Sequence, residues 1–584
     1  MEKRMILAIA MSLAVLIGYQ YFYSAPPPPP GVTAGKDNAA AVPAPTAKGG
    51  STPAPASVAG GLAAKTAVPA RTITVKTPLF SAALATEGGA FSSFLLNEYK
   101  DAPGPGGKPL DIVGGKKVTP LSLYLDEDRP PLPSPPVFAS DAPAEIALKA
   151  GETRSVLLTW ESTGGVRVTR EYVFHGDKYE FEARVQTTNG SKEPVAVRPG
   201  LELGQIYEGE LAGDSYSFAG IVVGSGKSGL NRYDLKDISK GKVEKGPARW
   251  FAADAKYFTW IVLPEREWTV TRASLVGETG ARVAAADTAA TLQPGDAVRA
   301  GARVFAGPKR SALLEATGKD LPELIDFGWF AVVAKPLVFL MKASNRVTGN
   351  YGIDIILLTI LIKILFYPLT QKSMVSMRKM QELGPILKTL KEKYKGDAQR
   401  LNQETMNLYK TYKINPLSGC LPMLAQIPVF IALYKGLLVT IELRHAPFFL
   451  WVNDLSAPEH LWDIAVAGYT VPIRLLPLLM GVSMFVQQKM TPSAGMEPMQ
   501  QKMMLFMPII FTFMFWSFPT GLVIYWLVNN ILAIGQQMMY NSKAAAAKAA
   551  VPKDPMRTSK LIDGVVWDGK DPKRYAGTFK IKVA

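Results

Sequence analysis

The run Ile353-Asp-Ile-Ile-Leu-Leu-Thr-Ile-Leu-Ile-Lys363-Ile-Leu-Phe-Tyr-Pro368 decides the fold, because it is apolar and interrupted by one basic residue. A lysine at the centre of a membrane helix costs about 2.5–3.5 kcal/mol, so it usually faces a wet cavity or a partner. The competing interpretation is a lysine whose flexible stem carries the ammonium to the headgroups near Pro368. The run therefore predicts a membrane helix in which Lys363 is a candidate functional residue.

The composition fits a chain that lies partly in a membrane and partly in water. Its 584 residues are 48% hydrophobic, and the formal net charge is +16. A strongly basic chain favours anionic surfaces such as lipid headgroups or RNA. Cys420 is the single cysteine, which excludes an intramolecular disulfide, so any exported domain must be held together by packing alone.

The N-terminus predicts a membrane anchor over residues 1–24. The basic start Met1-Glu-Lys-Arg4 precedes an apolar run that ends in aromatic residues at Tyr23. A cleaved signal peptide is the alternative, but the run is long and its aromatic end is typical of an interfacial belt. Residues 25–70 are rich in Pro, Ala and Gly and predict a disordered tether that cannot bury a core.

Residues 71–322 predict a large all-β sandwich. Apolar and polar residues alternate over 166–168, 172–174 and 179–185, and Asn189-Gly190 supplies a turn. Period-two alternation with frequent turn signals is typical of a sandwich. We find no metal-ligand spacing, nucleophile elbow or phosphate loop in this region, so we expect no catalytic residue, no metal and no cofactor.

The second half of the chain predicts a helical membrane domain. We expect an amphipathic interfacial helix over 323–345, and a five-helix core over 346–540 with spans at 352–370, 421–441, 464–487, 503–517 and 520–538. With the anchor, the chain has six transmembrane helices. The basic loop 372–414 and the basic tail 541–584 are expected inside the cell, which places both termini in the cytoplasm and the β-domain outside.

The cytoplasmic loop 372–414 predicts a helical hairpin that turns at Lys395-Gly-Asp397. Apolar residues recur at helical spacing with basic residues between them. Methionines in such a stripe favour an adaptable contact surface over a merely solvated loop. The candidate residues for contact with substrate or ribosome are Met374, Met377, Arg378, Lys379, Met380 and Lys388.

Several motifs in this half resemble the YidC/Oxa family of membrane protein insertases. They occur in order, with family-like spacing, as Asn350-Tyr-Gly352, Tyr367-Pro-Leu-Thr370, Asn415-Pro-Leu-Ser-Gly-Cys-Leu-Pro422, Gln426-Ile-Pro-Val-Phe430 and Phe518-Pro-Thr-Gly-Leu522. The outer region is similar to the Gram-negative YidC type, at Gly88-Gly89, Trp250, Tyr257-Phe258, Gly307-Pro-Lys309 and Asp326-Phe-Gly-Trp329. The resemblance implies a protein of the bacterial inner membrane with a periplasmic β-domain.

The resemblance also implies a function: insertion and folding of nascent membrane proteins, alone or beside the Sec translocon. In this family a groove open to cytoplasm and lipid carries a positive residue, and Lys363 occupies that position. Many relatives have arginine there, so lysine keeps the charge but loses the planar fork. The expected groove residues are Lys363, Thr359, Gln426, Ser483, Tyr525, Trp526 and Asn529. Each polar residue of this set, taken alone, more often forms an interhelical hydrogen bond than lines a groove.

Other partners and other classes of protein remain to be weighed. The basic tail and hairpin favour the ribosome and anionic lipid as further partners. The apolar helices at 353–367 and 503–516 span only about 21–23 Å, which predicts local thinning of the bilayer. A secondary transporter is an alternative, although no internal repeat or midplane carboxylate is visible. A membrane-anchored carbohydrate-binding protein built on the β-sandwich is another.

Overall fold

The computed structural model describes residues 68–115, 118–124, 135–212, 217–226, 229–415, 421–466, 469–490, 498–549, 565–567 and 572–574. The expected anchor and nearly all of the expected tether lie outside these residues. The chain divides into two compact units. The first comprises Met1–Val338, Leu383–Ile414 and Ile431–His445, and the second comprises Phe339–Glu382, Asn415–Phe430 and Ala446–Ala584.

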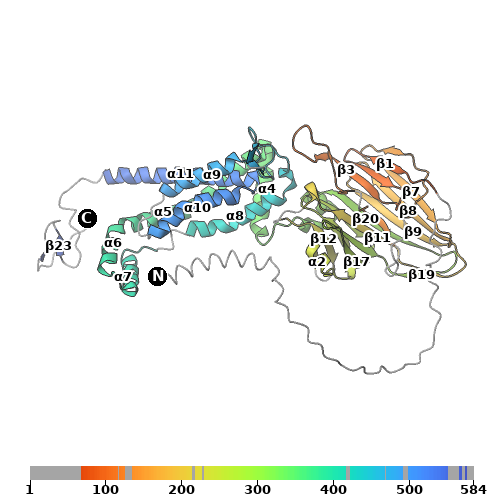
Figure 1. Ribbon diagram of the computed structural model, residues 1–584, viewed down its shortest axis with the longest axis horizontal. Helices are drawn as coiled ribbons and strands as arrows, with labels where there is room; N and C mark the ends of the chain where they lie inside the picture. Colours follow the sequence, from red (N-terminus) through yellow and green to blue (C-terminus); the bar gives the residue numbers. More distant parts are fainter. Residues whose placement is uncertain are drawn as a thin grey trace, which may run out of the picture. The chain divides into compact units, whose positions relative to one another are not determined.

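The β-domain of the first unit is built on one large sheet and several smaller ones (Figure 1). The eight-stranded sheet has the order β13 (Gly229–Asp234), β12 (Gly220–Ser225), β15 (Trp250–Asp254), β16 (Phe258–Pro264), β20 (Ala297–Pro308), β9 (Glu180–Asn189), β8 (Val166–His175) and β7 (Thr153–Glu161). All its pairs are antiparallel.

Two five-stranded sheets and one two-stranded ladder complete the domain. One sheet has the order β4 (Pro109–Asp111), β3 (Phe91–Lys100), β2 (Phe80–Ala85), β1 (Thr72–Lys76) and β6 (Glu145–Ala147). The other has the order β14 (Gly246–Ala248), β17 (Trp268–Val276), β18 (Gly280–Ala286), β11 (Gly200–Ile206) and β5 (Ser122–Tyr124). The ladder pairs β10 (Val195–Val197) with β19 (Ala290–Leu292), and the short helices are η2 (Gly209–Leu211), α2 (Leu235–Ser239), α3 (Ser311–Thr317) and η3 (Leu321–Leu324).

The core of this domain follows from the alternation in the sequence. Every second residue of β8 is buried, as the period-two pattern predicts. Phe91 of β3 packs its ring against Phe181 of β9 and Trp260 of β16, with ring centroids 5.3 and 5.8 Å apart. The five-stranded sheet that contains β3 and the eight-stranded sheet therefore enclose one aromatic core. The prediction that this region is mostly β is confirmed.

One core position of β8 carries a charge that the sequence pattern did not single out. Arg170 is fully buried and donates to the carbonyl of Gly88 at 2.9 Å and to the hydroxyl of Tyr172 at 2.5 Å. Tyr172 in turn donates to the carbonyl of Gly89 at 2.6 Å. Both glycines have positive φ, and these bonds satisfy their carbonyls. Burial lowers the pKa of Arg170, and this hydrogen-bonded setting is what keeps a charge tolerable there.

The helices begin where the β-domain ends. Their bounds are α4 (Ala331–Thr348), α5 (Tyr351–Glu382), α6 (Gly384–Lys393), α7 (Ala398–Thr411), α8 (Leu421–Val439), η5 (Ile441–Leu443), α9 (Leu475–Met490), α10 (Pro498–Phe515) and α11 (Thr520–Ala549). Two short hairpins are also present, β21 (Trp462–Val466) with β22 (Tyr469–Ile473), and β23 (Val565–Trp567) with β24 (Pro572–Arg574). In the second unit, α11 packs against α5 and α9, and α10 packs against α9 (Figure 1).

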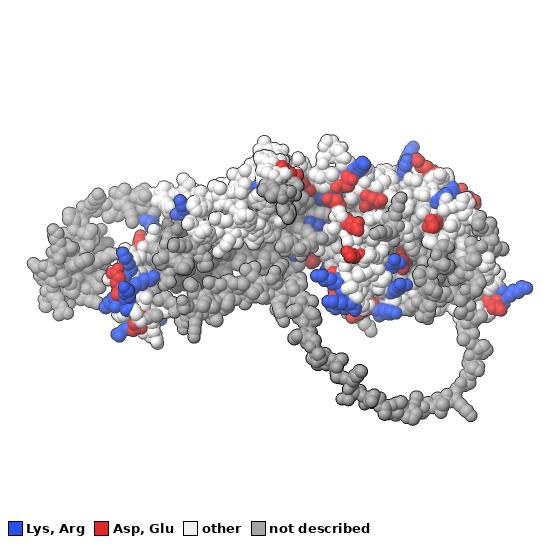
Figure 2. Space-filling model, viewed as in Figure 1, with Lys and Arg blue, Asp and Glu red and all other residues white. Residues whose placement is uncertain are grey.

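Two of the described helices are long and apolar enough to cross a membrane, over Tyr351–Glu382 and Thr520–Lys543. Shorter apolar helices lie at Leu424–Val439 and Met504–Phe515. Large apolar side chains are exposed along the first of the long helices and along α10, among them Leu361, Ile364, Leu365, Phe506, Ile509, Ile510 and Phe513. Figure 2 shows charged atoms gathered over α6 and α7 and over the β-domain, while the described surface of the apolar helices is mostly white. Such a wide apolar surface is expected of helices that face lipid.

Several element boundaries differ from those expected. The segment 464–487 was expected to be one span, but its start forms the strands β21 and β22, and helix α9 begins only at Leu475. A short apolar run rich in β-branched residues cannot be told from a helix by periodicity alone, and that explains the error. Helix α5 continues through Pro368 to Glu382, so the expectation of a short helix in this region was wrong.

The other differences concern helix ends. The expected interfacial helix begins at Ala331 and runs to Thr348. Helix α11 runs past the expected start of the tail to Ala549. The first half of the expected hairpin belongs to α5, and only α6 and α7 pair with each other. The turn between these two is where it was expected, with Gly396 at a φ of +104° and the Asp397 carboxylate accepting from the N–H of Arg400 at 2.9 Å.

Candidate functional site

Lys363 lies on α5, thirteen positions into the helix, in the middle of its apolar part. The residue is half-buried, while its neighbours Ile364 and Leu365 are 65% and 74% exposed. Within the described part of the chain, Lys363 has no ion pair and no hydrogen bond. A cation that is partly desolvated and unpaired favours water or an incoming anion as its partner.

Thr359 lies one turn before Lys363 on the same helix. It is buried, and its hydroxyl donates to the carbonyl of Ile355 at 2.6 Å. The hydroxyl hydrogen is therefore used inside the helix, and only its oxygen remains able to accept a bond. Thr359 thus contributes polarity near Lys363 without an unsatisfied donor.

Two of the expected groove residues contact each other across helices. The amide nitrogen of Gln426 on α8 donates to the hydroxyl of Tyr525 on α11. Tyr525 is 1% exposed and Gln426 is half-buried. The pair ties α8 to α11 within the second unit, which corresponds to the interhelical interpretation of these residues.

A second polar pair joins α9 to α11. The amide nitrogen of Asn530 donates to the hydroxyl of Ser483 at 3.0 Å, and that hydroxyl donates to the carbonyl of Met480 at 2.6 Å. Asn530 is 3% exposed, whereas the expected site residue Asn529 is half-buried. Asn530 therefore makes the contact to Ser483, and Asn529 stays a predicted groove residue.

Trp526 belongs to an aromatic cluster rather than to the polar pairs. Its ring centroid lies 5.0 Å from that of Phe430, 6.0 Å from that of Phe511 and 5.2 Å from that of Phe515. Its indole nitrogen is buried without a hydrogen-bond partner in the described structure. An unsatisfied donor of this kind costs free energy, so it is a natural place for water to enter between the helices.

A third polar contact was not expected from the sequence. The amide nitrogen of Gln536 on α11 donates to the hydroxyl of Thr370 on α5 at 3.0 Å. Helix α11 therefore contributes a polar contact to each of α8, α9 and α5. Both residues carry a polar side chain in a helix that is otherwise apolar, which is the same sequence feature that marks Gln426, Ser483 and Tyr525. No hydrogen bond among the described residues links Lys363 to any of these pairs.

The expected contact residues of the cytoplasmic loop lie on two helices. Five of them are on the extension of α5, and Lys388 is on α6. The methionines Met374, Met377 and Met380 are half-buried, while Lys379 and Lys388 are exposed. The basic side chains are thus the accessible part of this surface.

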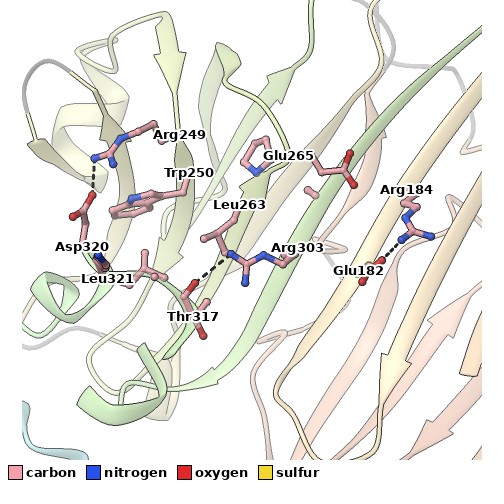
Figure 3. Close-up of a pocket in the computed structure, with 14 residues that line it drawn as sticks. Glu182, Arg184, Arg249, Trp250, Leu263, Glu265, Arg303, Thr317, Asp320 and Leu321 are labelled. Carbon is pink, nitrogen blue, oxygen red and sulfur yellow. Dashed lines mark hydrogen bonds and ion pairs between the residues drawn. The ribbon is translucent and has the colours of Figure 1, made fainter. Parts of the chain in front are cut away.

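The β-domain contains a cleft of about 630 Å³ between the strands β16 and β20 and the turn that follows α3 (Figure 3). Its charged groups are largely paired within the protein. Arg249 bonds Asp320 at 2.7 Å, and Arg303 donates to the carbonyl of Thr317 at 3.3 Å. Arg184 bonds Glu182 in the same view. Glu182 and Asp320 are held in ion pairs, which makes these two carboxylates poor candidates for general acid–base catalysis.

Among the described residues, no group of three His, Cys, Asp or Glu side chains could hold a metal ion. The features that remain are one unpaired cation on an apolar helix and polar contacts that radiate from α11. Together with the β-domain, they define a class of protein: a membrane protein whose apolar helices carry a polar interior and a large extramembrane β-domain.

Comparisons with known proteins identify the family. A family profile described as 60Kd inner membrane protein matches residues 343–547, and one described as YidC periplasmic domain matches residues 72–340. The chain is 39% identical over 559 residues to the membrane protein insertase YidC of Pelobacter propionicus, covering 93% of this chain and 99% of that protein. It is 40% identical over 567 residues to the membrane protein insertase YidC of Syntrophus aciditrophicus, covering 93% of this chain and 100% of that protein. The chain belongs to the YidC family of membrane protein insertases.

Solved structures include members of the same family. The crystal structure of YidC from Thermotoga maritima covers 80% of this chain and 99% of that chain, at 15% sequence identity and a TM-score of 0.28. At this score the superposition adds nothing to the assignment made from sequence.

Proposed function

We propose that this protein inserts and folds nascent proteins of the bacterial inner membrane through a hydrated, positively charged groove at Lys363. The single observation that carries the proposal is the partly desolvated ammonium of Lys363, which has no protein partner in the described structure. Polar pairs such as Gln426–Tyr525 and Ser483–Asn530 lie within apolar helices of the same unit. We propose that they share one wet cavity with Lys363 and help keep it hydrated.

The proposed mechanism lowers the barrier for a polar segment in three ways. Water in the groove reduces the cost of desolvating the segment. The ammonium of Lys363 attracts an acidic segment. A membrane potential that is negative inside then drives each negative charge outward with about 2.3 kcal/mol per 100 mV. The apolar part of the substrate leaves sideways because burial in lipid is favourable.

A short helix contributes a fourth effect. The apolar run 503–516, which forms most of α10, spans about 21 Å at 1.5 Å per residue, below the hydrocarbon core of about 30 Å. Mismatch of this kind thins the bilayer nearby. A substrate beside α10 therefore crosses less hydrocarbon.

The proposed topology has six spans. These are the N-terminal anchor and five helices that correspond to α5, α8, α9, α10 and α11. Both termini lie in the cytoplasm and the β-domain lies in the periplasm, which the basic segments 372–414 and 541–584 favour through the positive-inside rule. The proposed partners are the Sec translocon, the ribosome through the exposed Lys379, Lys388 and the basic tail, and anionic lipids.

The experiment that tests this function measures the insertion of an acidic-tailed, single-span substrate into vesicles. Wild type is compared with Lys363→Ala and Lys363→Arg, and Lys372→Ala serves as the control because Lys372 is an exposed lysine farther along α5. We expect alanine at 363 to abolish insertion and arginine to support it. If Lys363→Ala inserts the substrate as well as wild type does, the charge is not the working element of the groove.

A further inference from the structure

The junction between α4 and α5 contains a buried carboxylate with three donors around it. Asp354 is 0% exposed. Its Oδ1 accepts from the hydroxyls of Ser344 and Thr348, each at 2.7 Å, and its Oδ2 accepts from the side-chain amide of Asn345 at 2.7 Å. The donors all lie on the last turns of α4, and the acceptor lies in the first turn of α5. We call Ser344, Asn345, Thr348 and Asp354 the corner cluster.

The backbone between the two helices is equally well determined. Gly349 has a φ of +64° and donates its N–H to the carbonyl of Asn345 at 2.9 Å, which ends α4. The side chain of Asn350 accepts from the N–H groups of Gly352 and Ile353 at 2.9 and 3.3 Å, which begins α5. The linker between the helices thus consists of one glycine and one capping residue, and both are fixed by hydrogen bonds.

The carboxylate of the corner cluster stabilises both helices. Hydrogen bonds to an ionised carboxylate are about twice as strong as neutral ones. A negative charge is also favourable in the first turn of a helix, which is where Asp354 lies in α5. Since all three donors come from α4, the loss of the carboxylate removes the three side-chain bonds by which the cluster joins α4 to α5.

The rotation of α5 about its own axis matters because its outer end is tightly packed. A Cβ on Gly352 would overlap the ring of Phe448. Gly521, at the start of α11, lies so close to α5 that a Cβ there would be 3.0 Å from Ile355. A small rotation of α5 is therefore opposed on two sides. Lys363 lies nine residues beyond Asp354, about 13.5 Å along the same helix, and it turns with the helix.

We propose that Asp354 is a positioning residue for insertion: its carboxylate locks α4 to α5 and thereby fixes the direction in which Lys363 points. This inference rests on the proposed function only in its last step. The locking itself is a statement about the distance and angle between two helices, and it can be measured without any substrate.

The first measurement is the distance between spin labels on the two helices in the full-length protein in lipid nanodiscs. Phe339 on α4 and Leu365 on α5 are 69% and 74% exposed, so cysteines there can be labelled after Cys420→Ser removes the native thiol. We expect one narrow distance in the otherwise native chain and a broad distribution in Asp354→Leu. The exchange Ser344→Asp with Asp354→Ser returns a carboxylate to the cluster from the other helix, and we expect it to restore the narrow distance.

The second measurement is insertion of the acidic-tailed substrate by the same variants. We expect Asp354→Leu to slow insertion about fivefold, at the low end of coupling between separated groups, and the exchanged pair to recover it. Gly481→Ala, which strains a different helix contact, is the control for general destabilisation and should keep the narrow distance.

The outcomes separate this inference from the proposed function. An unchanged distance distribution in Asp354→Leu overturns the lock, whatever insertion does. A broad distribution with unchanged insertion overturns the positioning role. If Lys363→Ala also inserts normally, the proposed function fails, while the distance measurement still decides on the lock.

Discussion

Gly481 lies where α9 approaches α10 closely, because a Cβ there would overlap Thr512. We expect Gly481→Ala to lower the free energy of unfolding by about 1–3 kcal/mol through overpacking. Gly535 on α11 has open space around its Cβ position, so Gly535→Ala should be neutral or slightly stabilising. Thermal unfolding of both variants in detergent tests the pair, and equal melting temperatures would contradict this account of the contact.

Lys309 and Asp254 form a buried ion pair in the β-domain. Lys309 Nζ lies 3.1 Å from Asp254 Oδ2 and donates to the carbonyl of Leu324 at 3.3 Å. Burial raises the pKa of Asp254 and lowers the pKa of Lys309, so each charge depends on the other. Removal of one partner leaves an uncompensated charge and typically costs about 3–5 kcal/mol.

We therefore expect Lys309→Met to destabilise the β-domain strongly, and Lys309→Met combined with Asp254→Asn to recover much of the loss. Hydrogen exchange of β15 and β20 peptides in the full-length protein is the measurement. Should the double variant exchange faster than the single one, the pair is not held together mainly by its charges.

Some of the polar residues between the helices could be predicted from the sequence, and others could not. Gln426, Ser483 and Tyr525 could be found because a polar side chain in an apolar span needs a partner. Asn529 was predicted to line the groove, whereas Asn530 bonds Ser483. Adjacent residues on a helix differ by about 100°, and the sequence does not give the rotation of α11. Asp354 stands near the start of the apolar run 353–368, but the sequence does not show that Ser344, Asn345 and Thr348 of α4 donate to it.

At the scale of elements, α10 is the helix whose length carries a functional consequence. Insertion of one apolar turn, about four leucines, before Trp516 lengthens the apolar run by about 6 Å, which should reduce the mismatch and slow substrate insertion. The same insertion after Tyr540, beyond the apolar part of α11, is the matched control. Insertion rates in vesicles test this prediction, and an unaffected rate in the α10 variant argues against thinning as a contribution.

Elements whose apolar residues recur with a clear period were predicted well, and elements without such a period were not. The alternation in β8 and β9 gives the sandwich because both strands are long and half their residues are buried. The start of 464–487 lacks such a signal and forms a strand pair instead of a helix. The span was expected to end at 370, yet α5 passes through Pro368 and continues to Glu382, because the hydrogen bond lost at one proline does not by itself end a helix.

At the scale of the whole molecule, the β-domain and the groove residues fall in different units. We expect deletion of residues 75–310 to leave insertion of a simple single-span substrate largely intact, because no groove residue is removed. The measurement is the vesicle assay described above, with immunodetection to match protein amounts. Loss of insertion at equal protein amount would show that insertion requires the β-domain.

The C-terminal tail offers a second test at this scale. Since α11 continues to Ala549, the deletion should begin at Val551 so that the helix is left whole. We expect this deletion to weaken co-sedimentation with ribosomes and to make it less sensitive to salt, because basic contacts to RNA are lost. Unchanged sedimentation across a salt series would remove the tail from the list of ribosome contacts.

The continuity of α5 has a mechanical consequence. A helix of 32 residues is a rod of about 48 Å, longer than the hydrocarbon core, and it is clamped at its outer end by Asp354. Its one weak joint is Pro368, where a backbone hydrogen bond is missing. A load on the C-terminal end of α5 therefore bends the helix at that proline. In the proposed topology this end lies in the cytoplasm, where it can swing with a docking partner while the segment that bears Lys363 stays still.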